Sequence, residues 1–208
     1  MKYHIEKNTV QETLVIPLYG RKMCSELYPN LYRDETALRL INQIDYDFSL
    51  LSKKSKSLMQ QFGFLEAAMR QNDLAWEVRD YLREHPNAAV VNLGCGLDDT
   101  GRSCDNGSCR IYNLDFPGVI AVRLMLKTWI KTAEIQDVGA YFAVSDAKKE
   151  LSAWSPRLRV SSRGYMLGYQ SLNDPSVPGF YRFLARVGDG MMRMQIVRLE
   201  FAEGETAL

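Results

Sequence analysis

A short apolar run that ends directly in a glycine turn constrains this sequence more than any other feature. Residues 88–93 lack the alternation of a half-exposed strand, which predicts a strand buried on both faces of a sheet. The run passes into the turn Gly94-Cys95-Gly96-Leu97-Asp98. Glycines let a backbone adopt conformations that a Cβ forbids and let it approach a ligand closely. The segment therefore predicts the first strand and loop of a nucleotide-binding α/β domain.

A second predicted strand supports this interpretation. Residues 110–115 form an apolar run that ends on an acid, Asp115, roughly 20 residues beyond the second glycine. An acid at that spacing can accept hydrogen bonds from both hydroxyls of a ribose. Pro117 then stands where the first residue of a helix tolerates proline, and apolar residues follow it at helical spacing.

The spacing within the turn separates two classes of ligand. Dinucleotide enzymes use the pattern G-x-G-x-x-G, but the position of the third glycine holds Asp99 here. An acid at that position would repel a pyrophosphate. The pattern Gly94-x-Gly96-x-Asp98 instead suits a ligand without phosphates, and S-adenosylmethionine (SAM) is such a ligand. A nicotinamide-dependent oxidoreductase remains a less favoured alternative.

The rest of the chain predicts two regions within one structural domain, divided near Pro86. Residues 1–86 predict a helical cap. One helix begins after an N-cap at Asp34, and a polar connection follows over residues 49–63. A further helix is predicted over residues 65–84, with a buried stripe made of Leu74, Val78, Tyr81 and Leu82. Residues 87–208 predict a Rossmann-like ligand-binding region.

Two strands are predicted late in this second region, over residues 158–167 and 191–201. A loop rich in proline and glycine separates them, and no helix is predicted between them. Such strands favour an antiparallel pair. The predicted fold class is therefore α/β, with a Rossmann-like sheet, a helical cap and a C-terminal antiparallel strand pair.

Composition excludes several classes of function. The formal net charge of +1 provides no field for nucleic acid or an anionic membrane, and no apolar segment is long enough to span a bilayer. The N-terminus has no apolar core of a secretory signal, so a cytoplasmic location is expected. Cys104 and Cys109 lack the spacing of a zinc site, and free thiols are favoured over a redox pair or a metal site. No metal is predicted.

The residues quoted above resemble the leucine carboxyl methyltransferase family, which includes the tetracenomycin-type polyketide O-methyltransferases. The resemblance is carried by residues 90–100 and 112–117, and it extends to 13–21, 67–70, 140–154 and 196–201. It implies a SAM-dependent methyltransferase with a Rossmann-like fold. Within it, Gly94, Cys95, Gly96 and Asp98 would line the methionine and ribose part of SAM.

Three further residues receive roles from the same resemblance. Asp115 would hold the ribose hydroxyls, and Arg70 matches an arginine that pairs with the carboxylate of SAM in the family. Arg21 is a weaker candidate for the same pocket. From the residues alone, the favoured interpretation of Arg70 is an exposed residue of a helix.

The sequence departs from the family after about Arg123. Family members continue with further β-α units that build the far wall of the site, but here the chain passes directly into a segment that resembles the start of the family's C-terminal region. No strand is predicted between Asp115 and Leu158. An internal deletion is expected, with a truncated sheet of about four strands. The chain could be a deletion product, a gene fragment or a compacted variant.

The expected reaction is O-methylation of a small-molecule or carboxylate acceptor. The sequence has two histidines and singles out no general base, which slightly favours an acceptor that is already acidic. The alternative is a catalytically inactive remnant that binds SAM weakly or serves as an interaction module. Catalytic residues and the oligomeric state are not predicted.

Overall fold

The computed structural model describes residues 2–7, 9–126, 132–134, 146–168, 172–192 and 195–201. The chain divides into two compact units, Met1–Val138 and Gly139–Leu208. The predicted boundary near residue 86 falls inside the first unit, and the division into a helical cap and a ligand-binding region stays a prediction.

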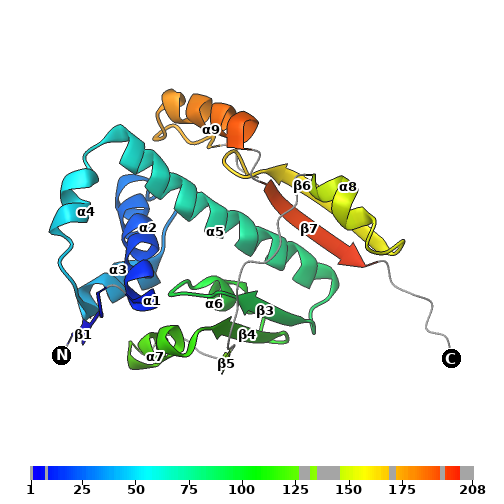
Figure 1. The fold of residues 1–208 in the computed structure, drawn as a ribbon, viewed down its shortest axis with the longest axis horizontal. Helices are drawn as coiled ribbons and strands as arrows, with labels where there is room; N and C mark the ends of the chain where they lie inside the picture. The colour runs from blue at the N-terminus through cyan, green and yellow to red at the C-terminus, as the bar shows by residue number, and fades with distance from the viewer. Residues whose placement is uncertain are drawn as a thin grey trace. The chain divides into compact units, whose positions relative to one another are not determined.

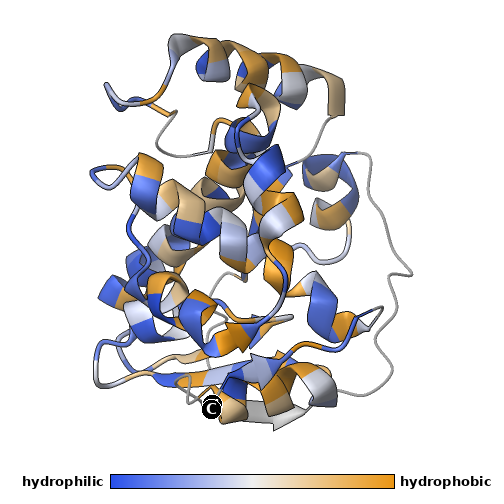
Figure 2. Ribbon diagram, turned by 90° about the vertical axis from the view of Figure 1, so that its left-hand side faces the viewer, coloured by the Kyte–Doolittle hydropathy of each residue, from blue (hydrophilic) through white to orange (hydrophobic). Residues whose placement is uncertain are grey.

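The first unit opens with helices that pack around one another (Figure 1). Asp34 caps the third of them as predicted, because its carboxylate accepts a hydrogen bond of 2.7 Å from the amide of Ala37. Figure 2 shows apolar and polar residues alternating around the helices, as expected for helices that bury one face. The elements are β1 (Tyr3–His4), α1 (Val10–Thr13), α2 (Val15–Leu27), α3 (Glu35–Leu40), η1 (Ile41–Gln43), β2 (Ile44–Asp45), α4 (Ser49–Lys54) and α5 (Leu58–Glu84).

Helix α5 is longer than predicted and turns a different face to the core. It begins at Leu58, and the hydroxyl of Ser57 caps it by accepting a hydrogen bond from the amide of Gln60. The prediction of a polar connection over residues 49–63 is therefore wrong, because this segment contains α4 and the start of α5. The predicted buried stripe is confirmed only in part: Leu82 is 4% exposed and Val78 packs against its cluster, whereas Leu74 and Tyr81 are each 46% exposed. The buried face is shifted because α2 packs along α5, and it carries Leu65, Ala68 and Met69 among others.

A three-stranded parallel sheet follows α5. Its strands are β3 (Ala89–Leu93), β4 (Arg110–Asp115) and β5 (Thr132–Glu134), in the order β3-β4-β5. Helices α6 (Thr100–Cys104) and α7 (Pro117–Met125) connect them, and Pro117 is the first residue of α7 as predicted. The prediction that no strand lies between residues 115 and 158 is wrong, because β5 was too short to give a periodic signal.

One face of this sheet is exposed, which corrects the prediction of a strand buried on both faces. Val91 is 52% exposed and Leu93 is 67% exposed, while Ile111 on the opposite face of the adjoining strand is fully buried. That buried face packs against α5 through a cluster of Leu82, Cys109 and Ile111. The strand was predicted correctly, but an apolar sequence does not by itself supply a cover for both of its faces.

A second buried cluster joins the glycine loop to the helices. Leu97, which lies in the loop after β3, is 3% exposed and packs with Leu14 and Leu18 of the N-terminal helices and with Val119 and Val122 of α7. Burying one leucine side chain contributes about 1.5–3 kcal/mol. The loop is therefore anchored in the main core of the first unit.

The second unit contains a two-stranded antiparallel sheet, which confirms the predicted strand pair. Strands β6 (Leu158–Gly164) and β7 (Gln195–Phe201) pair from Leu158 with Phe201 to Gly164 with Gln195. Helix α8 (Ala147–Ser152) precedes them, capped by Asp146, while the start of the segment 140–154 lies outside the described residues. The described residues do not form the predicted sheet of about four strands, because β6 and β7 form a sheet separate from that of β3, β4 and β5.

The expectation that no helix separates these two strands is wrong. Helix α9 (Gly179–Met192) lies between them and includes Met191, which was predicted as the start of the last strand. Its glycines weaken the helical signal in the sequence. The carboxylate of Asp189 compensates locally by accepting hydrogen bonds from the amides of Met166 and Leu167. Among the described residues, no helix is both long and apolar enough to cross a membrane.

Candidate functional site

The loop after β3 owes its shape to two glycines in the left-handed region. Gly94 has φ of +64° and Gly96 has φ of +49°. A Cβ at Gly94 would meet no atom within 4 Å, so conformation rather than space requires glycine there. The amides of Gly94 and Cys95 both donate to the carbonyl of Leu114, at 2.8 and 3.2 Å. These bonds tie the turn to the carboxyl end of β4.

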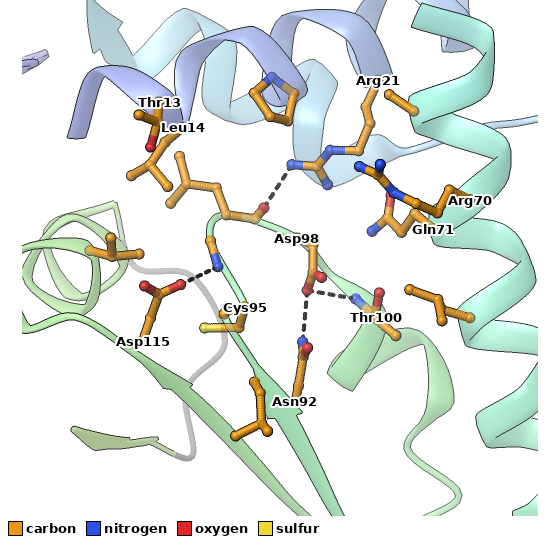
Figure 3. Close-up of a pocket in the computed structure, with 18 of the residues that line it drawn as sticks. Thr13, Leu14, Arg21, Arg70, Gln71, Asn92, Cys95, Asp98, Thr100 and Asp115 are labelled. Atoms are coloured by element: carbon orange, nitrogen blue, oxygen red, sulfur yellow. Dashed lines mark hydrogen bonds between the residues drawn. The ribbon is translucent and has the colours of Figure 1, made fainter. Parts of the chain in front are cut away.

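Asp115 ends β4 and faces the loop. Its Oδ2 accepts a hydrogen bond of 2.7 Å from the amide of Gly96 (Figure 3). Its Oδ1 accepts one of 2.8 Å from the amide of Phe116. A carboxylate offers about four lone-pair sites, so acceptor capacity remains for a ligand. The residues that were predicted to act together, the second glycine and the acid, are in direct contact.

Asp98 lies at the far end of the loop. Its Oδ1 accepts from the side-chain amide of Asn92 at 3.0 Å and from the backbone amide of Thr100 at 3.3 Å (Figure 3). Burial raises the pKa of this carboxyl above its usual range, and the positive charges of Arg21 and Arg123 partly offset that rise. Asp98 is therefore held by donors but is costly to keep ionised.

Two buried arginines contact the loop from different helices. Arg21 of α2 forms an ion pair with Asp34 at 2.7 Å and donates to the carbonyl of Leu97 at 2.9 Å. Arg123 of α7 is 2% exposed, and its Nη1 donates to the carbonyls of Gly96 at 2.8 Å and Asp98 at 3.0 Å. The carbonyls of three consecutive loop residues therefore accept hydrogen bonds from guanidinium groups.

A cavity of about 450 Å³ lies between this loop and the helices α1, α2 and α5. In Figure 3, Arg70 projects from α5 toward this space beside Gln71, and Asp98 and Asp115 lie across the loop from each other. The cavity brings together all seven residues that the sequence singled out, namely Arg21, Arg70, Gly94, Cys95, Gly96, Asp98 and Asp115. Their role in binding a cofactor stays a prediction.

Several residues of the site were missed by sequence reasoning. Asn92 holds Asp98, and Leu14 and Gln71 line the cavity. Arg123 gave one usable signal: a single cation stands within an apolar helical run that also includes the buried Val119 and Val122. A charge on the buried face of a helix requires partners, and here they are the carbonyls of the loop.

The cysteines are buried thiols without a disulfide. Burial raises the pKa of Cys95 to about 11, and Cys104 contacts the carbonyl of Ala75 through its sulfur at 3.4 Å. No group of three or more potential metal ligands occurs within the part of the chain that the structure describes.

The fold and the cavity define a class of site: a cavity at the carboxyl ends of parallel strands, bounded by a glycine loop and by an acid that ends the second strand, which is where α/β folds of this kind bind ligands. Comparison with known proteins narrows the class. The chain is 32% identical over 118 residues to the tetracenomycin polyketide synthesis O-methyltransferase TcmP of Streptomyces glaucescens. The chain is thus similar to a methyltransferase.

The extent of this similarity is limited. It covers 56% of this chain and 42% of that relative, so the chain spans less than half the length of the protein it matches. No protein-family model matches the chain. No solved structure matches it. The internal deletion after Arg123 stays a prediction.

Proposed function

We propose that this chain binds SAM in the cavity beside the glycine loop and transfers its methyl group to an oxygen atom of a small molecule. One observation carries the proposal: the loop of Gly94 and Gly96, the acid Asp115 and the cation Arg70 surround a single space of about 450 Å³. Ligand pockets of small molecules and cofactors occupy about 300–1,000 Å³. The similarity to an O-methyltransferase over 118 residues supports the same class of reaction.

The charges around the cavity fit SAM better than a dinucleotide. Two carboxylates, Asp98 and Asp115, line it together with the loop, and they would attract a sulfonium or ammonium group and repel a pyrophosphate. Arg70 supplies a positive charge on the opposite wall, where it could meet a carboxylate. In this proposal Asp115 accepts from the ribose hydroxyls while it keeps its bond to Gly96.

The chain's own contribution to the reaction would be positioning and the exclusion of water. When bound, SAM supplies a methyl group on a sulfonium centre, which is already an electrophile. The described residues that line the cavity include no histidine, lysine or tyrosine, and the thiol of Cys95 has a pKa raised to about 11 by burial. An acceptor oxygen that is ionised at neutral pH needs no general base. We therefore favour a carboxylate or an acidic hydroxyl as the acceptor.

Ligand binding tests the cofactor part of the proposal. Calorimetric titration with SAM, S-adenosylhomocysteine and NAD should give a dissociation constant in the micromolar range for the first two and no heat of binding for NAD. Absence of binding at millimolar S-adenosylhomocysteine would sink the proposal. Preferential binding of NAD would favour the oxidoreductase alternative.

Turnover separates an enzyme from an inactive remnant that still binds SAM. The chain would be incubated with SAM labelled in its methyl group and with a panel of aryl carboxylates, acidic phenols and neutral alcohols. Incorporation of label into the first two classes is expected. Binding without incorporation into any class would favour the remnant. A cytoplasmic location and the absence of nucleic-acid and membrane partners stay predictions.

A further inference from the structure

The backbone carbonyls of the glycine loop are captured by two guanidinium groups from different helices. Arg123 holds the carbonyls of Gly96 and Asp98 through one nitrogen, Nη1, at 2.8 and 3.0 Å. Arg21 holds the intervening carbonyl of Leu97 through Nη2 at 2.9 Å. Three consecutive peptide groups therefore have their oxygen atoms fixed.

Both arginines are buried, and Arg21 also has a partner outside the loop. The guanidinium of Arg21 is paired with Asp34 at 2.7 Å, with both side chains almost fully buried. Asp34 is held in turn by the hydroxyl of Tyr32 and by the amide of Ala37. Arg123 is 2% exposed within α7. A buried side chain that is locked in this way cannot easily follow a moving loop.

Fixing the carbonyls also fixes the rest of each peptide group. A peptide unit is planar and trans, so the direction of its oxygen determines the direction of its amide hydrogen. The peptide group that carries the clamped carbonyl of Leu97 also carries the amide of Asp98, which donates to the carbonyl of Cys95 at 3.0 Å. The amide of Gly96 lies in the peptide group just before the clamped ones and donates to Asp115. Both hydrogen bonds depend on the shape of the loop that lines the cavity.

We propose that Arg21 and Arg123 are positioning residues that clamp the loop in its ligand-binding shape rather than ligands of the cofactor. The expected effect of the clamp on ligand affinity rests on the proposed function, but its expected effect on the conformation of the loop does not. The clamp couples the N-terminal helix α2 and the helix α7 to the same three peptide groups. A preorganised loop loses little conformational freedom when a ligand binds, which favours affinity.

Variants of Arg123 test the clamp, with a neighbouring residue as the control. Arg123→Met keeps the length of the side chain but removes the donors. Arg123→Lys retains one cationic nitrogen that can donate to both carbonyls, as Nη1 does. Val122→Ala removes buried contacts from the same helix and lowers stability without changing a contact to the loop backbone.

Two readouts are measured on each variant: urea unfolding for global stability and titration with S-adenosylhomocysteine for affinity. Arg123→Met is expected to weaken binding by about ten-fold or more, whereas Arg123→Lys and Val122→Ala stay within about three-fold of the original chain. Equal weakening in Val122→Ala at an equal loss of stability would overturn the clamp, since affinity would then follow stability alone.

Hydrogen exchange without ligand separates failure of the clamp from failure of the proposed function. In Arg123→Met the amides of Gly96 and Asp98 should exchange about ten-fold faster, while those of β3 and β4 keep their protection. Unchanged exchange of the loop amides would refute the clamp. If the original chain does not bind S-adenosylhomocysteine, the proposed function fails, and the hydrogen-exchange rates of the loop amides alone decide whether the clamp exists. If Arg123→Met does not fold, Arg21→Lys replaces it under the same criteria. A lysine at this position can keep the ion pair with Asp34 but cannot also donate to the carbonyl of Leu97.

Discussion

The carboxylate of Asp115 accepts a hydrogen bond of 2.7 Å from the amide of Gly96. This contact joins the end of the second strand of the sheet to the turn that follows the first strand. Gly96 has a positive φ in this turn, and Asp115 lies on the wall of the cavity. The pairing of a glycine turn with a later acid, which the sequence only indicated by spacing, is a physical bond.

Substitution of this acid should reduce affinity for the cofactor. Asp115→Asn leaves one acceptor oxygen in place of two and turns an amide nitrogen toward an N–H donor. We expect S-adenosylhomocysteine to bind about 1–3 kcal/mol more weakly by calorimetry. Asp105→Asn is the matched control, since Asp105 also accepts from a backbone amide, that of Gly107, but does not line the cavity. Equal affinity for both variants would mean that the ribose lies elsewhere.

The left-handed conformation of Gly94 should be measurable as a strain energy. Gly94→Ala places a Cβ in open space but at φ of +64°, so a loss of about 1–2 kcal/mol in the free energy of unfolding is expected. Gly63→Ala is the opposite case, because Gly63 lies within α5 and a Cβ there would also meet no atom within 4 Å. It should gain about 0.5–1 kcal/mol. Urea unfolding of both variants checks the pair, and a Gly94→Ala variant as stable as the original chain would contradict the left-handed turn.

The sequence predicted the part of the site that is continuous in the chain. The strand, the turn and the acid over residues 88–115 follow from local apolar patterns and from the conformational freedom of glycine, and they are present at nearly the predicted bounds. The cap at Asp34 was equally local. Such features depend on neighbours within a few residues, which a sequence displays directly.

Features that depend on distant partners were not predicted. Arg21 meets the carbonyl of Leu97 across 76 positions. The family resemblance placed Arg21 at the same pocket, but no local pattern in either segment indicates this hydrogen bond. The exposed face of β3 reflects which elements cover the sheet and not the composition of Val91 or Leu93. Helix α9 was missed because its glycines lower local helix propensity, while tertiary contacts such as those of Asp189 stabilise it.

Stability should depend on pH through Asp98. Burial raises the pKa of its carboxyl in the folded chain, so between the unfolded and the folded pKa the folded state binds more protons than the unfolded state. Stability from this group is therefore greatest at acidic pH and falls as the pH rises through that window. Asp98→Asn keeps an acceptor for Asn92 and Thr100 and removes the charge.

This variant should unfold at a higher urea concentration than the original chain at pH 7, with a difference that shrinks as the pH falls below the range in which Asp98 ionises. Asp105→Asn should show no such trend. A variant that is less stable at pH 7 would indicate that the nearby arginines outweigh the cost of burial.

The cysteines should react slowly in the folded chain. Burial raises the pKa of Cys95 to about 11 and that of Cys24 to about 12, so very little reactive thiolate is present at neutral pH. Alkylation by iodoacetamide at pH 7.5 should be at least about 100-fold slower than in the chain unfolded by urea. Mass spectrometry after timed quenching measures both rates. Rapid modification of Cys95 in the folded chain would show that the loop opens.

The buried ion pair of Arg21 and Asp34 should show a coupling free energy in the stability of the chain. Asp34→Ala leaves a guanidinium that is 5% exposed without its carboxylate and removes the cap of α3, so a loss of about 3–5 kcal/mol is expected. Arg21→Met leaves Asp34 with the hydroxyl of Tyr32 and the amide of Ala37, and should cost less. The double variant should be more stable than the sum of the two losses predicts, because each single change leaves an unpaired charge that the double change removes. A double-mutant cycle in urea measures this coupling, and additive losses would show that water already reaches the pair and screens it.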